Sequence, residues 1–125
     1  MLYKPGREEI KLEAREIADK VFNIASDKQA ADIVLLDSQE VCSFADYFII
    51  CSAESARQMR AVAEEVVHAL KTDSVQPLHR EGTVESGWLL VDYGSVILHL
   101  FAPAERALYG LEELWSHARP VLRTS

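Results

Sequence analysis

The stretch Gly87–Phe101 decides how this sequence folds; it reads Gly-Trp-Leu-Leu-Val-Asp-Tyr-Gly-Ser-Val-Ile-Leu-His-Leu-Phe. Two apolar runs rich in strand-forming residues flank Gly94 and Ser95. A two-residue loop with glycine first is typical of a type II′ hairpin turn, and such a turn fixes which residues of the two strands pair. The stretch therefore predicts an antiparallel hairpin, and its register predicts on which face of the sheet each side chain lies.

The predicted pairing divides the hairpin side chains between two faces of a sheet. One face is apolar apart from one phenol and is expected to be core: Leu89, Val91, Tyr93, Val96, Leu98 and Leu100. The other face mixes aromatic, aliphatic and charged residues: Trp88, Leu90, Asp92, Ile97, His99 and Phe101. Such a mixture suits a recognition surface that must also survive in water. Coverage by another layer of the same domain, such as a terminal helix, is the alternative, and the residues alone leave both open.

Length and charge limit the classes of protein to which this chain can belong. The chain has 125 residues, which predicts a single domain over 1–125, large enough to build a core without disulfides or metals. A net charge of −7 argues against a general nucleic-acid binder and permits a basic protein partner. Two cysteines and a start without a secretory leader indicate a reduced, cytoplasmic protein, and no run approaches the roughly 20 apolar residues of a membrane span.

The spacing of apolar residues predicts the other elements of the first two thirds of the chain. Steps of three and four predict amphipathic helices over Arg7–Ser26 and from near Ser55 to Thr72, the second opened by a capping box that includes Gln58. Continuous apolar runs predict buried strands over Ala31–Asp37 and Asp46–Cys51.

The weakly apolar stretch Val75–Gly82 predicts an edge strand before the hairpin. After the hairpin, Pro103 suits the first turn of a helix that Gly110 is expected to interrupt. Pro120 and a short polar tail are expected to end the domain. Four residues of this last helix can share one face: Leu108, Leu111, Leu114 and Trp115. The fold class is therefore α/β, one domain with a mixed sheet of about five strands and flanking helices.

One motif raises the alternative of an enzyme. Cys51 and Arg57 stand between a strand and a helix start, as in phosphatases that use a cysteine thiolate and an arginine to handle phosphate. The intervening residues contain no glycine to wrap a phosphate, and Glu54 would place a negative charge there. The scattered histidines do not have metal-ligand spacing, so no metal site and no cofactor are expected.

Several motifs in fixed order resemble the ribosomal silencing factor family, also called Iojap-like. The resemblance covers roughly Ile10–Val121. Its motifs are Ala45–Ser52, Ser55–Gln58, Glu81-Gly82, Gly87-Trp88, Asp92–Gly94, His99–Phe101 and Arg106–Trp115. Ala53-Glu54 departs from the glycine or other small polar residue expected there, which leaves the shape of that loop open.

The resemblance implies a binding protein and not an enzyme. Members of the family bind the large ribosomal subunit on its fourteenth protein, hinder joining of the small subunit and so repress translation; they are commonly homodimers. Their fold is similar to the nucleotidyltransferase superfamily, but this sequence lacks the paired Asp-x-Asp that metal-dependent nucleotidyl transfer needs. Neither a membrane nor a specific nucleic-acid sequence is expected as a partner.

The mixed face of the hairpin is the expected ribosome-binding surface. Its predicted residues are Trp88, Leu90, Asp92 and His99, joined by Tyr93 near the turn and by Arg106 and Tyr109 after the hairpin. Tyr93 lies on the core face, but at the turn, where its hydroxyl is expected to reach solvent. The competing expectation is that Trp88 is buried inside its own domain.

Overall fold

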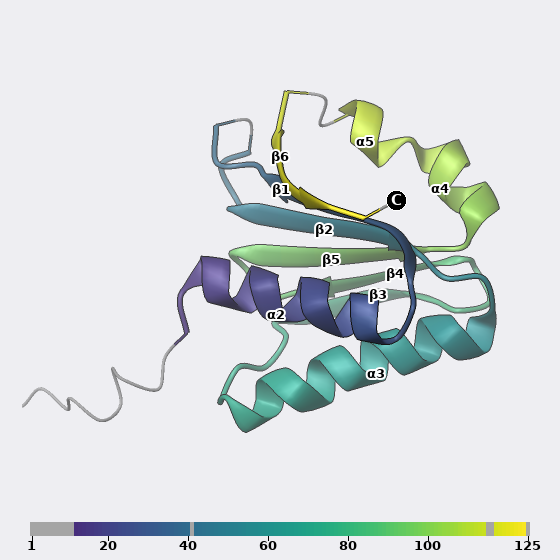
Figure 1. Cartoon of the computed structure of the whole chain (residues 1–125), viewed down its shortest axis with the longest axis horizontal. Helices are drawn as coiled ribbons and strands as arrows, with labels where there is room; N and C mark the ends of the chain where they lie inside the picture. The colour runs from purple at the N-terminus through teal and green to yellow at the C-terminus, as the bar shows by residue number, and fades with distance from the viewer. Residues whose placement is uncertain (1–11, 41, 115–116, 125) are drawn as a thin grey trace, which may run out of the picture.

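One six-stranded mixed sheet runs through the residues that the computed structural model describes, which are 12–40, 42–114 and 117–124 (Figure 1). The strand order is β3-β4-β5-β2-β1-β6. β2 and β5 pair in parallel, and every other neighbouring pair is antiparallel. The strands are β1 (Ala31–Asp37), β2 (Tyr47–Ser52), β3 (His79–Thr83), β4 (Trp88–Asp92), β5 (Val96–Phe101) and β6 (Arg119–Arg123).

The predicted hairpin and its register are confirmed in β4 and β5. Asp92 lies opposite Ile97, and Trp88 lies opposite Phe101. Gly94 has φ of +88°, the left-handed region that the first loop residue of a type II′ turn requires and that glycine adopts without steric cost. The hairpin side chains therefore divide between the two faces of the sheet as the turn predicted.

The C-terminal segment corrects the prediction of a polar tail. Arg119–Arg123 forms β6, a sixth strand that pairs antiparallel with β1. Pro120 is tolerated because β6 is an edge strand, where one side of the backbone has no strand partner. Nη2 of Arg119 also donates to Oδ2 of Asp37 on β1 at 2.7 Å. A cross-strand charge pair therefore accompanies a pairing that the apolar pattern did not indicate.

The opposite edge of the sheet is β3, as expected for this polar segment. Its five residues are all exposed, and it pairs only with β4. The strand begins at His79, four residues later than predicted, because Ser74 at φ +64° and the residues after it form the connection from the preceding helix. Charged side chains on such an edge discourage pairing with other chains.

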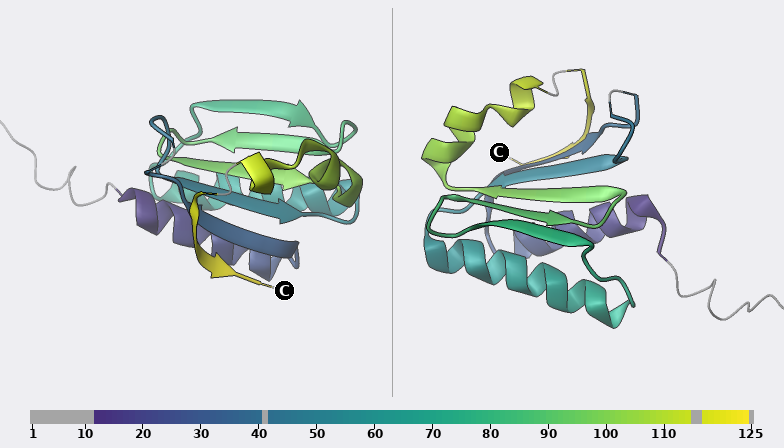
Figure 2. Two further views of the ribbon diagram at one scale, coloured as in Figure 1. Left: turned by 90° about the horizontal axis from the view of Figure 1, so that it is seen from above. Right: turned by 180° about the vertical axis from the view of Figure 1, so that it is seen from behind.

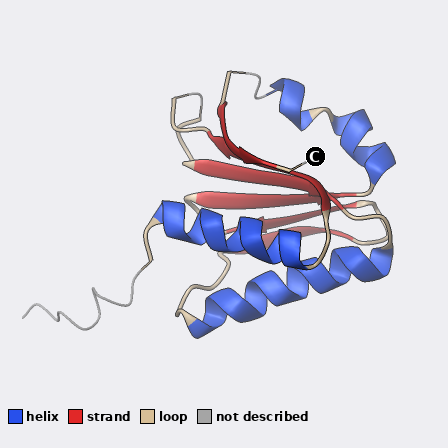
Figure 3. Ribbon diagram, in the orientation of Figure 1, coloured by secondary structure: helices blue, strands red, loops and turns tan. Residues whose placement is uncertain are grey.

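Two helices form a layer on one side of the sheet, and two short helices lie on the other side (Figure 2). The long helices are α2 (Ala14–Asp27) and α3 (Ala56–Thr72), which pack against each other and against the strands (Figure 3). Their predicted apolar stripes face the sheet, and the stripe of α3 is wholly buried: Met59, Val62, Ala63, Val66 and Leu70.

Side-chain caps fix where the long helices begin. α2 was predicted from Arg7; residues 7–11 lie outside the described part, and the helix begins at Ala14 because Glu13 and Glu16 form a capping box before it. At α3, Oγ of Ser55 accepts a hydrogen bond from the Gln58 N–H at 3.0 Å, as predicted. The Gln58 side chain accepts from the Glu54 N–H at 2.8 Å, one residue earlier than in a standard capping box.

The second layer consists of α4 (Pro103–Tyr109) and α5 (Leu111–Leu114), and Gly110 separates them as predicted. Gly110 has φ of +58°, so it ends α4 in a left-handed cap and redirects the chain. The predicted shared face of four residues is wrong in part, because Leu108 is 78% exposed while Leu111 packs against a buried cluster on the sheet. Trp115 and the side chain of Leu114 lie outside the described part.

The main core lies between the sheet and the α2–α3 layer, and it includes the apolar face of the hairpin. Leu98 on β5 has no exposed surface, and Val91 on β4 is 1% exposed. A smaller buried cluster lies on the other side of the sheet under α4 and α5: Val34, Leu36, Cys42, Ala45, Phe48, Ile50, Ile97, Phe101 and Ala118. The central strands are therefore buried on both faces, as expected for a parallel pair at the middle of a sheet.

Truncation of Leu98 tests this assignment of the core. Leu98→Ala should lower the free energy of unfolding by about 2–5 kcal/mol, because it removes a fully buried side chain and leaves a cavity. The matched control is Leu108→Ala on α4, which should change it by about 0.5 kcal/mol or less. Urea unfolding of both variants measures the difference, and equal losses would contradict the assignment.

Candidate partner-binding surface

The mixed face of the hairpin is covered along β5 and half open along β4. Phe101, Ile97 and His99 on β5 are 1%, 6% and 7% exposed. Their neighbours on β4, Trp88 and Leu90, are only half-buried. The alternative of coverage by the same domain therefore holds for the β5 row, and the β4 row remains partly open to solvent.

Four aromatic rings form one cluster on this face. The Trp88 ring is nearly parallel to those of His99 and Phe101, at 10° and 14°, with centroids 6.2 and 6.3 Å apart. Tyr109 of α4 closes the cluster, with its ring centroid 5.7 Å from both Trp88 and Phe101. Trp88 is thus fixed by neighbours on three sides without being buried.

His99 lies beneath the surface and not on it. Its Nδ1 accepts a hydrogen bond from the indole Nε1–H of Trp88 at 3.2 Å. Burial lowers the pKa of His99 to about 4, although the negative charge of Asp92 opposes the shift. The imidazole is therefore neutral near pH 7, the state in which one ring nitrogen can accept a hydrogen bond. The predicted contact role of His99 stays a prediction; in this chain its side chain has almost no exposed surface.

Asp92 combines a structural contact with an accessible charge. One carboxylate oxygen accepts a hydrogen bond from the Gly94 N–H at 2.6 Å, which supports the hairpin turn. The side chain is half-buried, and it lies on the same face as Glu81, since β3 and β4 pair antiparallel with Glu81 opposite Leu90. We call these two carboxylates the acidic rim; His79, which lies opposite Asp92, is hydrogen-bonded to Glu81 on the same face.

We call Trp88, Leu90, Asp92 and Tyr109 the β4–α4 surface. Tyr109 is 51% exposed, and Leu108, which precedes it on α4, is 78% exposed. Sequence reasoning included Tyr109 but assigned Leu108 to a packed helix face. The glycine two residues after Leu108 is the signal that could have separated it from the apolar residues of the next helix.

Tyr93 does not belong to this surface, and the prediction that its hydroxyl reaches solvent is wrong. The side chain is 8% exposed and packs in the core on the α2–α3 side. Its hydroxyl is buried with no hydrogen-bond partner among the described residues. Burial raises the pKa of Tyr93 to about 12, although Arg80 opposes the shift. Tyr93 is therefore part of the main core although it lies beside the turn.

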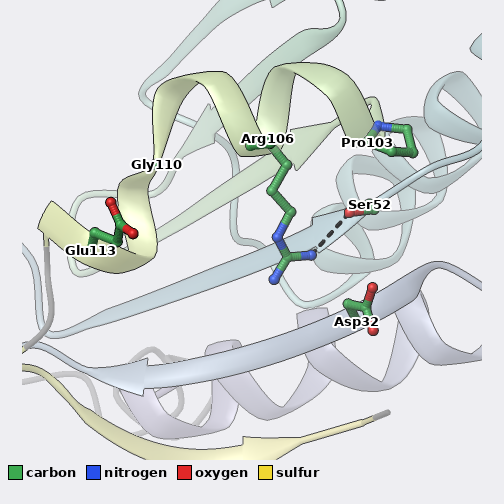
Figure 4. A pocket seen from close by; sticks show the side chains of 7 residues that line it. Asp32, Ser52, Pro103, Arg106, Gly110 and Glu113 are labelled. Carbon is green, nitrogen blue, oxygen red and sulfur yellow. Dashed lines mark hydrogen bonds between the residues drawn. The ribbon is translucent and has the colours of Figure 1, made fainter.

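Arg106 lines a groove and points toward Ser52 (Figure 4). Its Nη1 donates to Oγ of Ser52 at 3.0 Å, and Ser52 is itself buried. The groove encloses about 440 Å³ between α4 and the sheet, and Asp32 and Glu113 also line it. Arg106 thus links α4 to the end of β2.

The groove and the rest of the described chain offer no assembled metal site. Among residues 12–40, 42–114 and 117–124, no group of three or more His, Cys, Asp or Glu side chains is placed to hold a metal ion. Asp32, a candidate carboxylate in the groove, has φ of +49° at an irregularity in the β1–β2 pairing. Within the same residues, no helix is both long and apolar enough to cross a membrane.

The geometry does not support Cys51 and Arg57 as a phosphate-handling pair. Cys51 has no exposed surface and lies in the main core, whereas Arg57 is exposed on the first turn of α3. Burial raises the pKa of Cys51 to about 12, and the charge of Arg106 reduces that effect only in part. An attacking cysteine needs the opposite shift, toward the thiolate.

Thiol chemistry tests this placement. In a Cys42→Ser variant Cys51 is the sole thiol, and it should react with an aryl disulfide reagent at pH 8 more than tenfold more slowly than free cysteine. Full reaction should follow in denaturant, which serves as the control for reagent and protein. Rapid reaction in the folded protein, or aryl phosphate hydrolysis abolished by Cys51→Ser, would show that the thiol is activated.

Comparison with known proteins identifies the family. The family described as "Ribosomal silencing factor during starvation" matches residues 11–124. The ribosomal silencing factor RsfS of Bacillus subtilis is 41% identical over 92 residues, which cover 74% of this chain and 78% of that protein. A mouse protein named "Mitochondrial assembly of ribosomal large subunit protein 1" is 33% identical over 101 residues, 78% of this chain and 44% of that one. The crystal structure of a Chromobacterium violaceum protein has a TM-score of 0.80 at 32% identity, covering 91% of this chain and 95% of that one. This chain belongs to the ribosomal silencing factor family.

Proposed function

We propose that this chain represses translation by binding the large ribosomal subunit and blocking its association with the small subunit. Family membership supports the silencing role, and the name of the mouse relative refers to the large subunit. The observation that carries the proposal is the half-buried Trp88 of the β4–α4 surface, held by aromatic neighbours beside an acidic rim. Tryptophan and tyrosine are the residues that most often contribute binding energy at protein interfaces.

The proposed partner is the fourteenth protein of the large subunit, as the family resemblance implies. The chain carries a net charge of −7, which favours a basic protein and disfavours direct contact with ribosomal RNA. Asp92 and Glu81 place two carboxylates on the same face as Trp88. Apolar contact at Trp88 and Leu90 would supply affinity, while the acidic rim would orient the partner.

The proposed mechanism is steric and needs no catalytic step. A folded chain bound where the two subunits meet occupies space that the small subunit needs. The other titratable candidate, Cys51, is buried and holds its proton. The alternative of a phosphate-handling enzyme therefore has no observation in its favour among the described residues.

Truncation of Trp88 tests the surface. Trp88→Ala should weaken binding to isolated large subunits by about thirtyfold or more, because an interface tryptophan typically contributes about 2 kcal/mol. The loss of stability should stay below the roughly 3–5 kcal/mol of a fully buried tryptophan, since Trp88 is only half-buried. Leu122→Ala on β6, at the far edge of the sheet, is the control and should bind normally. Normal binding by folded Trp88→Ala would show that the surface is wrongly assigned.

Asp92→Asn tests the electrostatic part of the proposal. Asparagine keeps an oxygen to accept from the Gly94 N–H, so the turn should persist while the charge is removed. Binding should weaken about two- to fivefold at low salt, and its dependence on ionic strength should flatten. Glu64→Gln makes the same change of charge on the exposed side of α3 and should leave both properties unaltered. The same salt dependence in both variants would argue that Asp92 does not face the partner.

A further inference from the structure

The orientation of Trp88 depends on a hydrogen bond as well as on packing. Its indole Nε1–H donates to Nδ1 of His99 at 3.2 Å, across the β4–β5 pairing. The two rings are 10° from parallel, so the bond joins two rings of nearly the same orientation. A rotation of the indole about its χ2 angle would break this bond and leave a half-buried donor without its acceptor.

We infer that His99 is a positioning residue, which holds the Trp88 indole in the orientation that the ribosomal partner meets. The inference rests on the proposed function of the β4–α4 surface. His99 is 7% exposed, so its effect on a partner must pass through the side chain above it. Phe101 and Tyr109 contact the Trp88 ring, but Phe101 has no acceptor, and the indole N–H bonds to His99 and not to the Tyr109 hydroxyl. His99 therefore supplies what packing alone does not, a single preferred direction for the polar edge of the indole.

The chemical state of His99 suits this role. A neutral imidazole whose Nδ1 accepts carries its proton on Nε2, whereas a protonated ring has no acceptor. Burial favours the neutral ring at His99, and Asp92, on the same face, opposes this only in part. The bond is therefore available throughout the neutral pH range.

Fixing Trp88 before binding removes an entropic cost that the partner would otherwise meet. Ordering one side chain at an interface costs an amount equivalent to about a two- to tenfold loss of affinity. His99 should therefore change the affinity for the large subunit about two- to tenfold, although its own side chain does not contact the subunit.

Two substitutions separate the hydrogen bond from the ring. His99→Phe keeps an aromatic ring for stacking but has no acceptor, and His99→Asn places an amide oxygen near the position of Nδ1 but has no ring. The first readout is solvent exchange of the Trp88 indole N–H by NMR, with the resonance assigned by its loss in Trp88→Phe. We expect fast exchange in His99→Phe and protection in His99→Asn and in the unmodified protein.

The second readout is affinity for isolated large subunits. His99→Phe should bind about two- to tenfold more weakly than the unmodified protein, and His99→Asn should recover most of the loss. If the role of His99 were purely structural, both variants would be less stable. Their affinities would then not depend on whether residue 99 offers a hydrogen-bond acceptor. Slow indole exchange with unchanged affinity in His99→Phe would overturn the inference.

A measurement on the unmodified protein covers the case in which neither variant folds. Nitrogen-15 shifts of the His99 ring should show an unprotonated Nδ1 and a protonated Nε2 at pH 7; a proton on Nδ1 would exclude the bond and the inference. The outcome is independent of the ribosome. If Trp88→Ala binds large subunits normally while the His99 tautomer is as expected, the binding surface is wrong and the hydrogen bond stands.

Discussion

The tight turn at Gly94 is the constraint on which the rest of the structure depends. The Tyr93 N–H donates to the Val96 carbonyl at 2.8 Å, and Asp92 accepts from the Gly94 N–H, so only Gly94 and Ser95 lie between the hydrogen-bonded Tyr93 and Val96. This closure fixes the register, and the register decides which side chains enter the core. A slip by one residue would move Trp88 into the core and Val91 onto the surface, and both the core and the proposed binding face would be lost.

The position of each strand in the sheet then decides how far its outer face is covered. β5 is central, and α4 follows it directly, so the short helix packs back over its own strand. β4 lies one strand further out, next to the edge strand β3, and Tyr109 of α4 contacts it at Trp88. The aromatic rings on this face are therefore buried on β5, at His99 and Phe101, and partly exposed to solvent on β4, at Trp88. Such an arrangement suits binding, because the exposed ring is ordered before the partner arrives.

The local parts of this arrangement could be predicted from the sequence, and the long-range parts could not. The hairpin, the α3 cap at Ser55 and the break at Gly110 each depend on residues within a few positions of one another. β6 was missed because a proline and two arginines hide its short apolar centre, and its pairing with β1 spans most of the chain.

The candidate site was likewise predictable where it depends on local register and not where it depends on packing between distant segments. The register placed Trp88, Leu90 and Asp92 on one face, but it could not show that β4 is left half open while His99 is buried. Arg106 was grouped with this face because it follows the hairpin, whereas it contacts Ser52, 54 residues earlier in the chain. The homodimer stays a prediction, since a single chain does not reveal its partner.

The structure of this chain bound to the large ribosomal subunit tests the central claim most directly. An electron cryomicroscopy map should place Trp88 and Tyr109 against a protein of the large subunit, with the α2–α3 layer facing solvent and the chain overlapping the position of the small subunit. A map in which the α2–α3 layer or the β6 edge makes the contact, and Trp88 faces solvent, would contradict the account.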